Sequence, residues 1–167
     1  TVGLTDSKIH DEQTAYERSI SVLMTALAGP SMISTQAGAL NSLTDTSFEQ
    51  TMIDDEILGM VSRAISAIKV DEETLAVDVI AKVGPGHHFL AQKHTNDMFL
   101  KEHHLPRLAD RESKIKWERN GSKDIVKRAK ERAEEILRTH HPTPLPDEVR
   151  KKLDSIIDEA KRMRQPD

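Results

Sequence analysis

The stretch SFEQTMIDDEILGMVSRAISAI, residues 47–68, carries the clearest pattern in this chain. Ser47 and Gln50 have the spacing of a capping box, which marks the start of a helix. Apolar residues then recur at the helical period. They are Ile53, Ile57, Met60, Val61, Ala64, Ile65 and Ile68. The stretch therefore predicts a helix that begins at Ser47 and packs one apolar face against the core.

The residues before this helix predict a strand–helix–strand order. The polar run Thr5–Ser7 follows a short apolar stretch and is typical of a helix N-cap. One face of the helix after it would be apolar, and Gly29-Pro30 would end that helix. The residues of this face are Tyr16, Ile20, Leu23 and Leu27. Residues 31–34 then predict a short buried strand that leads into a turn at residues 36–38.

Four further helices are predicted after residue 68. The first opens at Asp71 and ends at Gly84-Pro85-Gly86. A polar, His-rich stretch follows through Pro106. The other three helices are expected at residues 110–119, at residues 122–139 with Ser122 as N-cap, and at residues 146–163.

The order of these elements indicates an incomplete α/β fold. Short apolar runs alternate with helices at the front of the chain, as in barrels built from βα units. The chain has too few candidate strands to close a barrel, so we expect a predominantly helical α/β fragment with few short strands. We divide it into an incomplete barrel, residues 1–108, and a helical C-terminal extension, residues 109–167. The chain opens at Thr1 without a Met, which also leads us to expect a longer protein.

The composition excludes several classes of protein. None of the 167 residues is Cys, which excludes a disulfide-stapled secreted domain, a thiolate zinc site and a cysteine nucleophile. No apolar run approaches the roughly 20 residues of a membrane-spanning helix, and no signal peptide opens the chain. We therefore expect a cytoplasmic protein without a membrane partner.

The charge distribution gives no support to nucleic-acid binding. Residues 1–100 carry 6 basic and 14 acidic side chains, and residues 101–167 carry 18 and 14. Both signs alternate in the rear helices, for example at Lys127 and Glu131, which is typical of an ion-paired, solvated face. The whole chain has five aromatic side chains, so few are available for nucleic-acid bases to stack on.

The eight histidines are the first candidates for chemistry. Six of them form adjacent pairs, whose side chains diverge on a helix or a strand, and no HExxH pattern is present. We therefore expect hydrogen-bonding or surface roles and no metal site. His87 or His88, beside the turn at Gly84–Gly86, remains a pocket candidate. That turn could also bring N–H groups against an anion, but a plain helix stop is favoured because the other P-loop and dinucleotide residues are missing.

Two acidic stretches give opposite expectations. Asp54-Asp55-Glu56 would point in different directions on a helix and would suit the helix dipole near its N-terminus, which favours a structural role over metal or acid–base chemistry. Asp6 follows a presumed strand end, where barrel enzymes place functional side chains. A helix N-cap role for Asp6 is compatible with that position.

A family resemblance rests on motifs that run in order through nearly the whole chain. The first is GLTDSK at residues 3–8, followed by Asp11, Gln13, Tyr16 and Glu17. The most specific is VGPGHHFL at residues 83–90, with His94-Thr95 after it. Weaker motifs lie at Ala28-Gly29, Gly38, Asp55-Glu56, Leu75-Ala76, Pro106–Leu108, Asp110-Arg111, Trp117 and Gly121. In these residues the chain resembles the C-terminal third of the trimethylamine methyltransferase family.

The resemblance implies a fold and an activity. It implies the C-terminal part of a TIM (β/α)8 barrel that demethylates a tertiary or quaternary amine, such as trimethylamine or glycine betaine. The methyl group would pass to the cobalt of a corrinoid carried by a partner protein, so no cofactor would be bound directly. Leu4 stands where trimethylamine-specific members have pyrrolysine, which implies the non-pyrrolysine branch. Gly86-His87 also departs from a Gly-Gly of the family.

From the resemblance we take Leu4, Asp6 and His88 as substrate-pocket candidates, with His94 on the rim. None has an assigned catalytic role. We expect most of any aromatic cage for the amine cation to lie in the absent front of the barrel. The expected partners are the corrinoid protein, the amine, and either the missing N-terminal barrel portion or further copies of the chain. The alternative is a catalytically inactive helical interaction or scaffold module derived from a truncated barrel.

Overall fold

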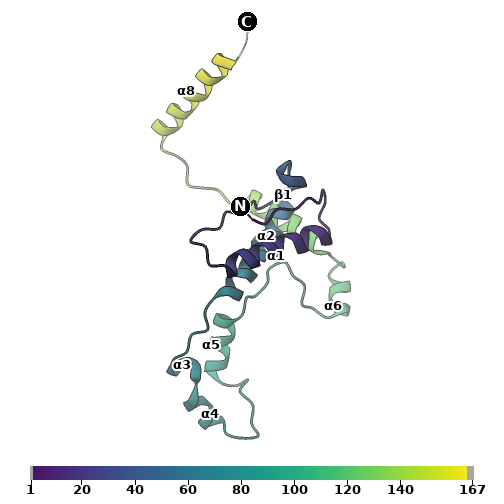
Figure 1. The fold of residues 1–167 in the computed structure, drawn as a ribbon, viewed down its shortest axis with the longest axis vertical. Helices are drawn as coiled ribbons and strands as arrows, with labels where there is room; N and C mark the ends of the chain where they lie inside the picture. Colours follow the sequence, from purple (N-terminus) through teal and green to yellow (C-terminus); the bar gives the residue numbers. More distant parts are fainter. Residues whose placement is uncertain (1, 165–167) are drawn as a thin grey trace. The chain divides into compact units, whose positions relative to one another are not determined.

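The computed structural model describes residues 2–164 and is drawn in Figure 1. Within them the chain is predominantly helical, as expected, and its two short strands pair as one antiparallel sheet. The elements are α1 (Glu12–Leu27), β1 (Ala39–Leu40), β2 (Asp45–Thr46), α2 (Phe48–Ile65), α3 (Glu72–Leu75), α4 (Val77–Val83), α5 (Lys93–Glu102), α6 (Lys114–Arg119), α7 (Ile125–Thr139) and α8 (Asp147–Arg164), with a 3-10 turn at Asn41–Leu43. Two compact units divide the chain, one up to Glu135 and one from Ile136 on. The expected boundary at residues 108/109 stays a prediction.

The start of α2 confirms the capping interpretation of residues 47–50. The Ser47 side chain accepts a hydrogen bond from the Gln50 N–H at 3.1 Å. The Gln50 side chain does not return to Ser47; it donates to Asp54 instead. Only part of the expected apolar stripe is buried, because Ile57 and Val61 are buried while Met60 and Ile65 are exposed and Ile68 lies beyond the helix end.

Helix α1 corrects two expectations. Its N-cap is Asp11, whose side chain accepts from the Thr14 N–H at 3.0 Å, and not the run Thr5–Ser7. The face predicted to be buried is mostly exposed, since Tyr16, Ile20 and Leu27 lie in solvent. The buried stripe is Thr14, Arg18, Val22 and Ala26. Because α1 packs against α2, the stripe that meets α2 decides the buried face, and this stripe contains an arginine.

The hydrophobic core lies between these two helices. Its buried members are Val22, Ala26, Ile57 and Val61, surrounded by the partly buried Val2, Leu23, Ile33, Ile53 and Leu58. A parallel bridge joins Val2 to Thr35, and the Val2 N–H donates to the Ser34 carbonyl at 3.0 Å. The bridged residue therefore lies just past the strand expected at residues 31–34. The antiparallel pair of β1 with β2 was not predicted from the sequence.

The segment from Asp71 to Glu102 differs from its expected form. Asp71 caps a helix as predicted, by accepting from the Thr74 N–H at 2.9 Å, and Gly84 ends α4. The expected single helix is interrupted at Ala76, which has a left-handed φ of 48° and separates α3 from α4. Helix α5 forms inside the stretch that was expected to be polar and without a helix.

The helices of the rear third match the sequence more closely. Helix α6 occupies only the second half of the range expected at residues 110–119. Helix α7 begins after Asp124, whose side chain accepts from the Lys127 N–H at 2.7 Å, so Ser122 is not its N-cap. Helix α8 begins one residue after the expected position. None of the helices in residues 2–164 is long and apolar enough to cross a membrane.

Candidate functional site

Two loops come together at the end of the parallel bridge. The Asn41 N–H donates to the Ser7 carbonyl at 2.8 Å, and the Ser42 N–H donates to the Thr5 carbonyl at 3.0 Å. The Ser42 hydroxyl also donates to the Asp6 carboxylate. These contacts fix the loop that carries Leu4 and Asp6 against the loop that follows Thr35. Both candidate side chains are exposed at this edge.

Glu17 of α1 holds the Asp6 loop through hydrogen bonds to its carboxylate. One carboxylate oxygen accepts from the Thr5 hydroxyl at 2.7 Å and from the Asp6 N–H at 3.1 Å. The Gln13 amide donates to the other oxygen at 3.0 Å. The Thr5 hydroxyl, with Gln13 next, lowers the pKa of Glu17, because these donors stabilise the charged form. Asp6 therefore sits on a loop whose main chain is held in place.

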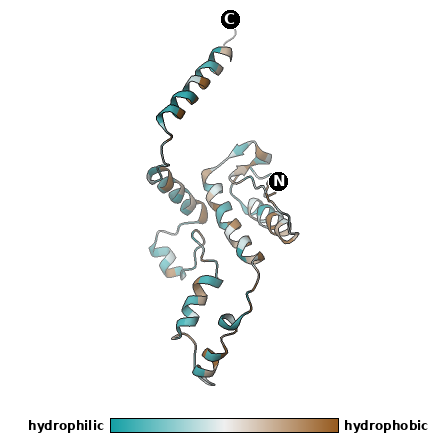
Figure 2. Cartoon of the chain, turned by 90° about the vertical axis from the view of Figure 1, so that its left-hand side faces the viewer, coloured by the Kyte–Doolittle hydropathy of each residue, from teal (hydrophilic) through white to brown (hydrophobic). Residues whose placement is uncertain are grey.

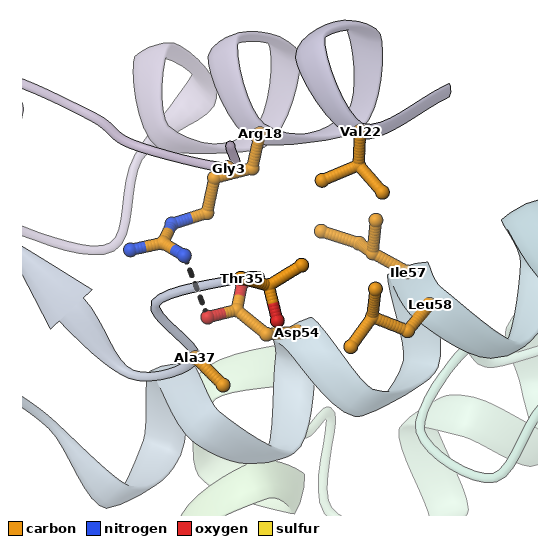
Figure 3. A pocket seen from close by; sticks show the side chains of 8 residues that line it. All are labelled: Gly3, Arg18, Val22, Thr35, Ala37, Asp54, Ile57 and Leu58. Carbon is orange, nitrogen blue, oxygen red and sulfur yellow. Dashed lines mark hydrogen bonds and ion pairs between the residues drawn. The ribbon is translucent and has the colours of Figure 1, made fainter. Parts of the chain in front are cut away.

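A buried ion pair lies between α1 and α2, as Figure 3 shows. Arg18 Nη1 of α1 and Asp54 Oδ2 of α2 are 2.8 Å apart, and both residues are at most 5% exposed. The Gly38 N–H donates to the same carboxylate oxygen at 2.7 Å, and the Gln50 amide donates to the other at 2.8 Å. The pair thus joins α1, α2 and the loop after Thr35.

Burial acts on the charge of both partners. It raises the pKa of Asp54, although the hydrogen bonds from Gly38 and Gln50 and the charge of Arg18 oppose the shift. It lowers the pKa of Arg18, against the attraction of Asp54.

A chain of polar contacts continues from Gln50 to the start of α2. Gln50 Oε1 lies 3.0 Å from His10 Nδ1, and His10 Nε2 lies 3.1 Å from the Ser47 hydroxyl.

The cavity beside this ion pair is too small for an amine substrate. Its volume is about 10 Å³, and Figure 3 shows Val22, Ile57 and Leu58 along its apolar side. A single water needs roughly 10–15 Å³ of such space. Arg18 Nε and Nη2 are buried here without a hydrogen-bond partner. The ion pair is therefore a support for the loops, and the cavity beside it has no room for a substrate.

The acidic triplet of α2 points in three directions, as expected. Asp54 faces α1, Asp55 is exposed, and Glu56 is buried. The structural role expected for the triplet is confirmed for its two buried members, which accept hydrogen bonds from distant main chain. Glu56 Oε2 accepts from the Arg107 N–H at 3.0 Å, and its carboxylate also accepts from the N–H groups of Leu108 and Ala109. It anchors residues 107–109 to α2.

The two candidate histidines lie on other elements. His94, at the start of α5, has Nε2 at 2.7 Å from the Glu73 carbonyl. It borders a shallow hollow with Asp78 and Asp97. His88 is exposed in the loop after α4, beside His87, which is exposed too. In residues 2–164 no hydrogen bond or ion pair joins either candidate to the edge that carries Leu4 and Asp6, so the pocket role of all four stays a prediction.

Comparison with known proteins identifies the family. The family model for trimethylamine methyltransferase (MTTB) matches residues 1–165. The chain belongs to this family. Trimethylamine methyltransferase MttB of Methanosarcina barkeri is 39% identical over 155 residues, which cover 93% of this chain and 31% of the relative. MttB2 of Methanosarcina mazei is 40% identical over 157 residues, or 94% and 31% of the two chains.

A relative that is named for a different substrate is almost equally similar. The glycine betaine methyltransferase of Desulfitobacterium hafniense strain Y51 is 37% identical over 155 residues, which cover 93% of this chain and 32% of the relative. The chain thus spans about a third of the length of these relatives, as the motifs in its sequence indicated.

Sequence reasoning missed the residues that hold this family member's loops. Arg18 lies on a buried stripe of α1 whose other members are small or apolar, and Asp54 lies on the buried face of α2 beside the polar Gln50 and Glu56. The charges of Arg18 and Asp54 are opposite. That combination was the available signal, because a charge within a buried stripe needs a partner of opposite sign. Glu56 had no such signal, since its partners are main-chain N–H groups about fifty residues away.

Proposed function

We propose that this chain is the C-terminal part of an enzyme that transfers a methyl group from a tertiary or quaternary amine to a corrinoid protein in the cytoplasm. The family match over residues 1–165 carries the proposal. The two kinds of relatives are named for trimethylamine and for glycine betaine. The coverage of about a third of each relative leaves the activity to the longer protein.

The local topology supports a place in a TIM barrel. Val2 and Thr35 form a single parallel bridge with helix α1 between them in the sequence, which is the connectivity of a strand–helix–strand unit. The β1–β2 pair then precedes α2. TIM barrels repeat this unit and place their active sites at the carboxyl ends of the strands. Leu4 and Asp6 lie just past the first bridged residue, at that end. The barrel portion missing from this chain would supply the remaining strands.

The edge residues of this chain would position the substrate. Asp6 offers a carboxylate to a cationic amine on a loop held by Glu17 and Ser42. Leu4 offers an apolar surface where trimethylamine-specific members have pyrrolysine, so we assign the chain to the non-pyrrolysine branch and expect a quaternary amine such as glycine betaine.

The corrinoid would arrive on a partner protein. When bound, it supplies a reduced cobalt that accepts the methyl group. The cobalt of a corrinoid is held by its own macrocycle, so the side chains of this chain would only have to present the amine to it. No step of the transfer is assigned to a side chain of this chain.

One observation favours a second function, that of an inactive helical interaction module. Helix α8 has an apolar face that is exposed in the structure. Under this alternative the chain would bind partners through such faces and would take no part in methyl transfer.

The test is methyl transfer by the longest protein that contains this chain. The protein is mixed with its corrinoid partner in the Co(I) state, and methyl–cobalt formation is followed by absorbance with glycine betaine or trimethylamine. We expect transfer, with glycine betaine preferred. Asp6→Asn should lower kcat/KM by roughly tenfold or more, about 1.4 kcal/mol, whereas the exposed Asp55→Asn is the matched control. A folded protein that transfers no methyl group from any amine would support the alternative instead.

A further inference from the structure

Helix α8 carries a repeating apolar seam that the proposed activity does not use. The seam positions alternate spacings of four and three residues over two heptads. They are Val149, Leu153, Ile156, Ala160 and Met163. This alternation is the a/d pattern of a coiled coil, in which each apolar side chain enters a hole on a facing helix. An isolated helix in solvent gains no stability from this a/d pattern.

The seam has no partner in its own unit. Every residue of α8 is exposed, and its large apolar side chains are between 43% and 77% exposed. Figure 2 shows brown apolar positions on an otherwise teal helix. Among the described residues of the unit from Ile136 on, no other helix is available to cover it apart from the last residues of α7. The helix therefore needs a second helix from elsewhere.

The charges of α8 fit a second copy of the same helix in antiparallel orientation. Its first turn is acidic, with Asp147 and Glu148, and its last turn is basic, with Lys161, Arg162 and Arg164. An antiparallel pair brings each acidic end beside a basic end and also aligns the helix dipoles favourably. A parallel pair would place like charges together at both ends.

We propose that α8 pairs with α8 of a second copy of this chain as a short antiparallel coiled coil. In the register that alternates a and d positions, Leu153 faces Ile156 of the other copy, and Val149 faces Ala160. Lys152 and Glu159 flank the seam on the same edge, so each Lys152 lies opposite a Glu159. The two heptads make a small interface, and the dimer is weak and depends on concentration.

Lys152 and Glu159 give the proposed register its most specific test. Charged helix ends also stabilise their own helix dipole, so they alone would not require a partner. Lys152 and Glu159 are seven residues apart on the same helix, beyond the reach of the i+3 and i+4 pairs that stabilise a single helix. Their opposite charges matter to each other only across a dimer.

The experiment measures the mass of the full chain by sedimentation over a wide range of concentrations. We expect a monomer–dimer equilibrium that Leu153→Asp weakens by roughly tenfold or more, or about 1.4 kcal/mol. Ser155→Asp, which lies off the seam, is the matched control and should leave the equilibrium unchanged. Lys152→Glu and Glu159→Lys should each weaken the dimer, and the two together should restore it.

A second measurement fixes the orientation. Since the chain has no Cys, Val149→Cys with Ala160→Cys should form a disulfide between copies under mild oxidation. Three results would overturn the proposal: a monomer at all concentrations, a dimer indifferent to Leu153→Asp, or a dimer that oxidation does not cross-link through these two cysteines. The second would indicate a different interface, and the third a different orientation of the two helices. These outcomes are independent of methyl transfer.

Discussion

The α1–α2 pair and α8 differ in which of their charged and apolar side chains are buried. Between α1 and α2 the structure buries Arg18 and Asp54 next to Val22 and Ile57, while Tyr16 and other apolar side chains of α1 stay in solvent. Helix α8 has a regular seam and buries nothing. The difference teaches that a periodic apolar pattern identifies a face that can pack, but the partner decides whether that face or another one is buried.

The largest effect should come from breaking the buried ion pair. Asp54→Leu leaves Arg18 buried without a counter-charge and should cost about 3–5 kcal/mol of unfolding free energy. Asp54→Leu together with Arg18→Met should return most of this loss, because two apolar residues need no partner. Urea denaturation of the full chain measures both. Additive losses in the double variant would mean that the two charges act separately.

A matched pair of truncations tests the comparison directly. Ile57→Ala, in the core, should cost roughly 2–5 kcal/mol, since it leaves a cavity between α1 and α2. Ile156→Ala, on α8, should change the free energy of unfolding of the unit up to Glu135 by less than about 0.5 kcal/mol. Urea denaturation at concentrations where the chain is monomeric measures this change. Equal losses would show that α8 packs against that unit.

Neighbouring carboxylates of α2 give a smaller contrast. Glu56→Ala removes the acceptor of the N–H groups at Arg107 and Leu108, and should cost about 1–3 kcal/mol because buried donors lose their partner. Asp55→Ala, on the exposed side, should stay within about 0.5 kcal/mol. Amide hydrogen exchange at Leu108 provides the second readout, and unchanged protection there would contradict the anchoring role of Glu56.

The smallest effect concerns the pH dependence of two aspartates. Hydrogen bonds from Lys69 and Thr74 lower the pKa of the half-buried Asp71 from 3.8 to about 2. Its contribution to stability is therefore complete above 3.8 and is lost as the pH falls through about 2. Asp54 has the opposite sign, since its raised pKa makes the folded state bind the proton more tightly. NMR titration of the two carboxyl groups should show Asp71 below 3.8 and Asp54 above it.

Local features of the fold could be predicted because their causes lie within a few residues. Ser47 and Asp71 start helices since a side-chain oxygen accepts the N–H three positions on. Gly84 ends one because its φ of 70° favours glycine. Helix α5 was missed because its composition is polar, and the break at Ala76 has no sequence signal of its own.

The candidate site could be predicted only in part. The position of Asp6 after a strand-like segment follows from the order of elements. The support beneath it could not be foreseen, because the Arg18–Asp54 pair joins residues 36 positions apart and Glu56 reaches residues still farther away. The motifs of residues 83–95 identify the family, but the structure leaves His88 and His94 on separate segments from Asp6.

Sequence alone therefore decided the family, the mainly helical character and some helix ends, such as those at Ser47, Asp71 and Gly84, since these depend on short-range chemistry. The folded chain decided which face of α1 lies inside and what role each carboxylate of α2 has. The physical reason is that burial of a charge is favourable only where a partner removes its desolvation cost, and that partner is supplied by tertiary packing. For α8, whose apolar seam is exposed, we look for the partner outside its own unit.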